Sequence, residues 1–256
     1  MKYVLTSNTI NYNGRILHQI KAMESFGRVE KGDLGGYIEK YANLSLSGAA
    51  WVFDKARVFG DAQVFDDATV SGEAWVSGRA YIFDEAQIAD NAWVFGEAQV
   101  FNKAQVLNNA QIFGEAKVFN EAVIKDNGSA SGKSRVYGKA EISNNARIMN
   151  RARIHGNARI CHDAQVFGDA QVFGEAIVAH WAQVCGKAKV FDATIFGSAL
   201  IRDRARIFGF AEVYEDAIIS DNVWIFDRAK IHGTVDVSGD IRIGENKDYD
   251  GHNTLQ

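Results

Sequence analysis

The sequence predicts an all-β protein, a three-sided parallel β-helix of about 11 coils of 18 residues that follows a short N-terminal β cap. Three observations lead to this prediction. An aliphatic residue recurs every six residues from Leu46 onward, an outward aromatic residue recurs every eighteen, and the chain contains no proline. Proline would remove a hydrogen-bond donor from a strand ladder, so its absence fits a chain of stacked strands.

Residues 1–45 are expected to form the cap. An open solenoid end exposes unpaired strand edges, so it needs to be covered. The run Arg15 to Met23 is typical of a strand that follows the turn Asn13-Gly14, and Lys2 to Leu5 would be its partner. The segment Lys31 to Glu39 then leads into the first coil.

Residues 46–244 are expected to form the solenoid. In the type unit VFGEAQ at Val94, an aliphatic residue opens the hexapeptide and a small residue, usually alanine, stands four places later. Side chains alternate between the faces of a strand, so residues 98–101 would point in, out, in and out. The Gly, Asn and Asp residues that follow suit corners with left-handed backbone. One unit, 190–194, has only five residues, and we expect a corner to absorb the missing one.

A column of outward aromatic residues indicates the number of sides. The outward residue after the opening aliphatic is aromatic, or once histidine, in every third unit, which means three units per coil. The outward position before the aliphatic in the same units holds several basic residues and no acidic one. The column is Phe65, Phe83, Phe101, Phe119, Tyr137, His155, Phe173, Phe191, Phe208 and Phe226, and its basic neighbours include Lys117, Arg135, Arg153, Lys189 and Arg206.

Three interpretations of this column are open. The rings could stack on one another as an in-register ladder and only stabilise the coils. They could form the core of an interface with a protein partner or with a second copy of the chain, with arginines packed over the rings. Rings flanked by cations could also bind single-stranded nucleic acid or another polyanion.

The N-terminal region carries a family resemblance. Residues 17–64, with GDLGGYIE at 32–39 and WVFDKARV at 51–58, resemble the entry segment of the YdcK-type β-solenoid family. The hexapeptide pattern likewise resembles the left-handed parallel β-helix. These resemblances imply a left-handed solenoid with a short β cap, encoded in bacteria or phages. Members of the family are often labelled acetyltransferases, but the resemblance implies no established activity.

No catalytic residue, metal site or cofactor is expected. His162 and His180 are eighteen residues apart and should stack on one corner, where two imidazoles could hold a metal or share a proton. They are weak candidates for the alternative function, an acetyl-CoA-dependent acyltransferase. Many enzymes with this fold carry a loop thrown out of a coil and a C-terminal helix, and this sequence predicts neither.

The C-terminal residues, the net charge and the hydropathy of the sequence limit the possible functions. Residues 245–256 are expected to form a polar C-terminal tail. The net charge of −4, the lack of a long apolar run and the absence of an apolar signal core predict a cytoplasmic protein without a membrane partner. The favoured function is a non-catalytic, rigid solenoid scaffold that binds a protein partner or itself. The resemblance to the YdcK-type family suggests a phage-encoded accessory protein or an inhibitor of a host protein.

Overall fold

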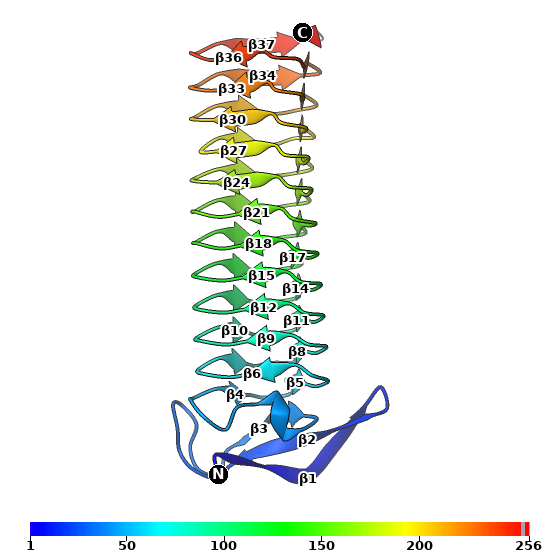
Figure 1. Ribbon diagram of the computed structural model, residues 1–256, viewed down its shortest axis with the longest axis vertical. Coiled ribbons are helices and arrows are strands. Elements are labelled where there is room, and N and C mark those ends of the chain that lie inside the picture. Colours follow the sequence, from blue (N-terminus) through cyan, green and yellow to red (C-terminus); the bar gives the residue numbers. More distant parts are fainter. Residues whose placement is uncertain (252–253, 256) are drawn as a thin grey trace. The chain divides into compact units, whose positions relative to one another are not determined.

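The computed structural model describes residues 1–251 and 254–255. The chain forms two compact units, Met1–Asp126 and Asn127–Gln256. Each unit is a parallel β-solenoid with three sheets (Figure 1). Partner residues of neighbouring coil strands are 18 apart, as Trp75 and Trp93 are, or 17 apart where the pair spans the five-residue unit, as Lys189 and Arg206 are. The predicted three-sided β-helix is therefore confirmed. Its left-handed winding stays a prediction.

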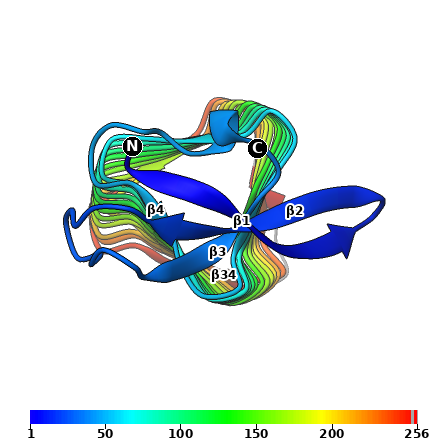
Figure 2. The same cartoon turned by 90° about the horizontal axis from the view of Figure 1, so that it is seen from below.

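The cap contains three strands and one short helix. Strand β1 (Tyr3–Tyr12) pairs antiparallel with β2 (Arg15–Ala22), and β2 pairs antiparallel with β3 (Leu34–Ile38) (Figure 2). The turn between β1 and β2 is the predicted Asn13-Gly14, whose φ angles are 49° and 80°. A 3-10 helix, η1 (Tyr41–Asn43), precedes the first coil strands.

The coil strands of unit 1 are short and fall into three sheets. After β3, the first sheet continues with β5 (Arg57–Val58), β8 (Trp75–Val76), β11 (Trp93–Val94) and β14 (Gln111–Ile112). The second contains β4 (Trp51–Val52), β7 (Thr69–Val70), β10 (Gln87–Ile88), β13 (Gln105–Val106) and β16 (Val123–Ile124). The third contains β6 (Gln63–Val64), β9 (Tyr81–Ile82), β12 (Gln99–Val100) and β15 (Lys117–Val118).

Unit 2 repeats this arrangement. One sheet contains β17 (Ser129–Ala130), β20 (Arg147–Ile148), β23 (Gln165–Val166), β26 (Gln183–Val184), β29 (Leu200–Ile201), β32 (Ile218–Ile219), β35 (Asp236–Val237) and β38 (Thr254–Leu255). Another contains β18 (Arg135–Val136), β21 (Arg153–Ile154), β24 (Gln171–Phe173), β27 (Lys189–Phe191), β30 (Arg206–Phe208), β33 (Trp224–Ile225) and β36 (Arg242–Ile243). The last contains β19 (Glu141–Ile142), β22 (Arg159–Ile160), β25 (Ile177–Val178), β28 (Thr194–Ile195), β31 (Glu212–Val213), β34 (Lys230–Gly233) and β37 (Asp248–Gly251).

Alanine, valine and isoleucine fill the core of each unit. Ala98 and Val100 are fully buried, whereas Gln99 and Phe101 lie on the outer face and are half-buried, as the strand period predicts. The alanine at the end of each corner leaves room for the aliphatic side chains that face it across the narrow prism.

The corners explain the choice of Asn, Asp and Gly. Asn102 has a φ of 58°, a left-handed conformation that asparagine tolerates better than most residues. Its backbone N–H donates to the Asp84 carboxylate of the preceding coil at 3.0 Å. Its own side-chain oxygen accepts the N–H of Asn120 in the next coil at 3.3 Å. Corner side chains thus form a second ladder outside the sheets.

The short unit is absorbed at a corner, as predicted. Phe173 pairs with Phe191 before that corner, and Ile177 pairs with Thr194 after it, so strand register is preserved on both sides. Only the turn between Phe191 and Thr194 is shortened.

Coil pairing extends beyond the predicted bounds of 46–244. At the start, β3 already pairs with β5. Gly35 and Gly36 permit this close approach, because a side chain at either position would collide with the carbonyl of Val52 or Ala56. Near the end, β37 pairs with β34 and β38 pairs with β35. The predicted polar tail, 245–256, therefore contains two ladder strands, although its residues 252–253 and 256 lie outside the described residues. The turns number about 12 rather than about 11.

Candidate interaction faces

Unit 1 carries a stacked aromatic column, here called the unit 1 ladder, made of Phe65, Phe83, Phe101 and Phe119. These residues follow β6, β9, β12 and β15. Successive ring centroids are 5.1, 4.8 and 4.9 Å apart and the ring planes lie within 3° of parallel. All four side chains are half-buried. The neighbouring rings cover one another's faces, so the ladder presents ring edges to solvent.

Unit 2 carries a longer column, the unit 2 ladder, which contains Tyr137, His155, Phe173, Phe191, Phe208 and Phe226. Centroids from Tyr137 to Phe191 are 4.8 to 4.9 Å apart, and Phe208 stacks on Phe226 at 5.4 Å. Burial, and secondarily the Arg153 charge, lowers the pKa of His155. This imidazole is therefore predominantly neutral at pH 7 and serves as one more ring in the stack.

Basic residues flank the unit 2 ladder in an unusual arrangement. Arg135 pairs with Arg153 on adjacent strands, and Lys189 pairs with Arg206. Like charges directly opposite one another in a sheet are destabilising. In another sheet of the same unit, the equivalent position of adjacent strands holds the ion pair Lys230–Glu212 at 3.2 Å. The like-charge pairs are thus a local feature of the strands that carry the unit 2 ladder.

Arginine also packs on aromatic rings here. The guanidinium groups of Arg206 and Arg242 lie 4.7 and 4.8 Å from the Trp224 ring centroid, within the range of cation–π attraction. Both arginine side chains are nevertheless exposed. Lys117, the predicted basic neighbour in unit 1, follows Gln99 on the next strand and is half-buried.

The two candidate catalytic histidines lie together, as their spacing predicts. The His162 and His180 rings are 4.6 Å apart and 9° from parallel, and both residues are exposed at a left-handed corner. Burial raises the pKa of the neighbouring Cys161 thiol, so this cysteine is protonated at neutral pH rather than a thiolate nucleophile. Within the described residues, no group of three potential ligands could hold a metal ion.

His232 has carboxylate partners that sequence reasoning missed. Its Nε2 lies 2.9 Å from the Asp248 carboxylate, and its Nδ1 lies 3.6 Å from Asp250 and 3.8 Å from Glu215. The His232 ring stacks on Tyr214 at 4.6 Å. Asp250 is 18 residues after His232, so extending the coil period into the supposed tail would have placed it there. These contacts tie β37 to the preceding coil.

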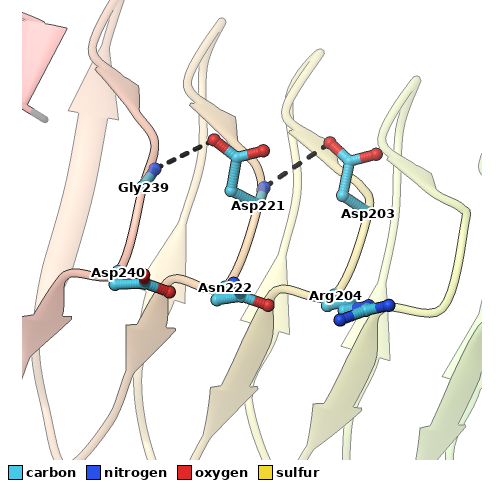
Figure 3. Close-up of a pocket in the computed structure, with 6 residues that line it drawn as sticks. All are labelled: Asp203, Arg204, Asp221, Asn222, Gly239 and Asp240. Atoms are coloured by element: carbon cyan, nitrogen blue, oxygen red, sulfur yellow. Dashed lines mark hydrogen bonds between the residues drawn. The ribbon is translucent and has the colours of Figure 1, made fainter.

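A corner groove in unit 2 has a cavity volume of about 420 Å³ (Figure 3). Asp203 accepts the backbone N–H of Asp221 at 3.5 Å, and Asp221 accepts that of Gly239 at 3.0 Å. These carboxylates belong to the corner ladder described above. Their hydrogen bonds have a structural role, and no ligand is needed to explain them.

The comparisons agree with this architecture. The family model described as the YdcK beta solenoid repeat matches residues 62–78, which span β6, β7 and β8. Together with the solenoid fold, this match confirms the resemblance to the YdcK-type family. No curated protein is significantly similar to the chain. Within the described residues, no helix is long and apolar enough to cross a membrane.

Proposed function

We propose that this chain is a non-catalytic solenoid scaffold whose aromatic ladders bind protein surfaces. The observation that carries the proposal is the combination, in unit 2, of stacked rings with exposed like-charge pairs. Binding to such a surface is favourable when the partner covers the ring edges and supplies carboxylates between the basic residues.

The two ladders suit different contacts. In unit 1, the residues beside the ladder are neutral at Gln63, Tyr81 and Gln99 and basic at Lys117, which pairs with a neutral residue, so like-charge repulsion is small and a second copy of the chain fits this face. In unit 2, two identical basic faces would repel each other. The unit 2 ladder is therefore better suited to an acidic protein surface, which would relieve the repulsion between Arg135 and Arg153.

Ring geometry favours protein binding over base stacking. A base that stacks needs an uncovered ring face, whereas Phe83 and Phe101 each have a parallel ring on both sides. Ring edges, in contrast, pack readily against the apolar and aromatic side chains that dominate interface cores.

Self-association is tested by light scattering on the wild-type protein and on a Phe101→Ser, Phe119→Ser double variant. The matched control is Phe95→Ser, Phe113→Ser, since these rings are also half-buried and stack at 5.1 Å on another sheet of unit 1. We expect a wild-type oligomer that dissociates in the first double variant and persists in the control. If the wild-type protein and the first variant are both monomers, self-association through this ladder is wrong.

The acidic-partner form is tested by capture from an extract of the native host. An Arg135→Glu, Arg153→Glu variant should lose a captured protein that wild type retains, and retention should fall as salt rises. An Arg147→Glu, Arg159→Glu control changes two exposed arginines on other sheets of the same unit and should retain it. Equal retention by both variants would refute a role for the unit 2 ladder.

A further inference from the structure

Unit 1 contains an aromatic pocket at the tip of its N-terminal hairpin. The turn between β1 and β2 lies against the outer face of β5, β8 and β11 and borders an open pocket of about 210 Å³. No charged side chain is among its lining residues, which are Tyr12, Asn13, Phe59, Trp75, Ser77, Trp93 and Phe95.

The pocket lies where one ring of a ladder is missing. Phe59, Ser77, Phe95 and Phe113 occupy equivalent outward positions in successive coils. Phe95 stacks on Phe113 at 5.1 Å with the planes 3° apart. At Ser77 the column has no ring, so the other face of Phe95 looks across the serine toward Phe59.

The size of this gap matches one aromatic ring. Two coil spacings separate Phe59 from Phe95, which is roughly 10 Å at ~4.8 Å per strand. A planar ring placed midway would lie about 5 Å from each neighbour, the distance at which aromatic rings stack. A ring in this gap would complete the ladder and would pack beside Tyr12, whose ring centroid lies 5.4 Å from that of Phe59.

Two further walls define the position of such a ring. Trp75 and Trp93 stack on each other at 4.8 Å beside the gap. Tyr12 contacts Trp75 edge-on at 4.7 Å and Phe59 at 5.4 Å. The Trp93 side chain is 41% exposed, so the pocket is open to solvent on that side.

The hairpin tip is held in place, so the pocket is already formed without a ligand. Arg15, next to the turn, forms an ion pair with Glu39 at 2.8 Å. The other Glu39 oxygen accepts the backbone N–H of Gly60 at 2.6 Å. This bridge connects the hairpin to the corner of the coil that contains Phe59, and so keeps Tyr12 against the sheet.

The charge near the pocket disfavours a cationic ligand. The Arg57 guanidinium lies 5.7 Å from the Tyr12 ring centroid and 5.4 Å from that of Trp75. These two rings therefore already make cation–π contacts with a side chain of the protein. Its Nε is buried without a hydrogen-bond partner among the described residues. No lining carboxylate could neutralise a second positive charge.

We infer that this pocket binds one uncharged planar aromatic ring, which inserts over Ser77 between Phe59 and Phe95. The ring can come from a small aromatic molecule or from an aromatic side chain of a partner. The site is on a different sheet from the unit 1 ladder, so it is independent of the function proposed above.

The inference is tested by calorimetric titration of the full chain with indole, a free aromatic ring, and with N-acetyltryptophanamide, which represents a side chain. We expect saturable 1:1 binding of at least one probe, with a dissociation constant on the order of a millimolar or below. Binding of indole alone indicates a small-molecule ligand, and tighter binding of the blocked amino acid indicates a partner's side chain.

Ser77→Phe is the decisive variant because it supplies the missing ring from the chain itself. It should weaken binding at least tenfold while the far-ultraviolet circular dichroism stays unchanged. Ser71→Phe makes the same change at the equivalent outward position after β7, on another sheet, and should leave binding unaltered. Trp93→Ala should also weaken binding, since it removes a wall of the pocket.

Tetramethylammonium serves as a counter-probe, because an aromatic cage for cations would bind it. We expect no saturable binding of this ion. The inference is overturned if neither aromatic probe binds, if Ser77→Phe binds as tightly as wild type, or if tetramethylammonium binds in preference to indole.

Discussion

The Asp192 carboxylate accepts the backbone N–H of Glu175 at 2.7 Å. In an ordinary corner, the amide at that position donates to a backbone carbonyl one coil later, as Asn157 donates to Gly174 at 2.8 Å. In the shortened unit, a side chain takes the place of that carbonyl. The missing residue is therefore compensated by one carboxylate.

Asp192→Ala should destabilise unit 2 by about 1.5–2 kcal/mol, because it removes a hydrogen bond to a charged group. Asp203→Ala is the matched control, since Asp203 has a similar φ of 60° but accepts a longer hydrogen bond of 3.5 Å. Urea denaturation followed by circular dichroism measures both. Equal losses would mean that the left-handed conformation, rather than the hydrogen bond, makes aspartate favourable at this corner.

Ser134→Ala should stabilise the chain by about 1–2 kcal/mol. The Ser134 hydroxyl is buried without a hydrogen-bond partner among the described residues, at a position where most units have alanine. The reverse change one unit later, Ala140→Ser, should destabilise by a similar amount. The midpoints of chemical denaturation report both effects, and a neutral or harmful Ser134→Ala would show that the hydroxyl is satisfied in solution.

The stability of the cap should rise with pH from about pH 8 and reach its maximum near pH 10. Burial lowers the pKa of Lys2 from 10.5 to about 8, although Asp67 and Glu24 act in the opposite direction. Below pH 8 the ammonium is charged in the folded and unfolded states, so its desolvation cost is fully present. Between pH 8 and 10.5 the unfolded chain binds a proton that the folded chain lacks, so stability rises with pH.

Tyr3 limits this rise. Burial, and then the Tyr41 charge, raises the pKa of Tyr3, so above pH 10 the unfolded tyrosine loses a proton that the folded one keeps, and stability falls. Urea midpoints from pH 7 to 11 should show the maximum. Lys2→Met should abolish the rise and Tyr3→Phe the fall. A wild-type midpoint that decreases steadily from pH 7 to 9 would contradict the assignment to Lys2.

The polyanion alternative predicts salt-sensitive binding of single-stranded oligonucleotides that Arg135→Glu, Arg153→Glu abolishes. The stacked geometry of the rings leads us to expect weak binding that depends on charge and is insensitive to Tyr137→Ser. Fluorescence anisotropy at low salt measures it. Strong binding that requires Tyr137 or Phe173 would instead support base stacking.

The acyltransferase alternative predicts turnover of acetyl-coenzyme A with an amine acceptor. Release of the free thiol over a panel of amines measures it, with His162→Ala and His180→Ala as the informative variants. We expect no turnover above background. Activity that disappears in either variant would overturn the non-catalytic proposal.

Most of the fold could be predicted because neighbours in space are separated by one fixed distance in sequence. The stacking of His162 on His180, the two aromatic ladders and the left-handed corners all follow from a period of eighteen. The same rule, applied to the residue before each aliphatic on every side, would also have identified the Trp75–Trp93 stack.

The pocket could not be predicted because the hairpin has no repeat. Nothing in the spacing of Tyr12 indicates that it would pack on Phe59 and Trp75, 47 and 63 residues later. That contact depends on the Arg15–Glu39 ion pair and on the antiparallel register of the cap. The contact of Asp248 with His232 is unpredictable for a related reason, since the polar residues around Asp248 lack the aliphatic repeat that marks a coil.

The corner ladder has an evolutionary consequence. Corner side chains such as Asp84 and Asn102 accept the backbone N–H of the residue one coil later, so duplication or loss of a whole eighteen-residue block keeps amides of this ladder opposite equivalent acceptors. Loss of a single residue, as at Asp192, is tolerated only when a carboxylate happens to be within reach. Members of such a lineage should therefore differ in length by whole coils, and the reach of a binding face would change with the copy number of the repeat.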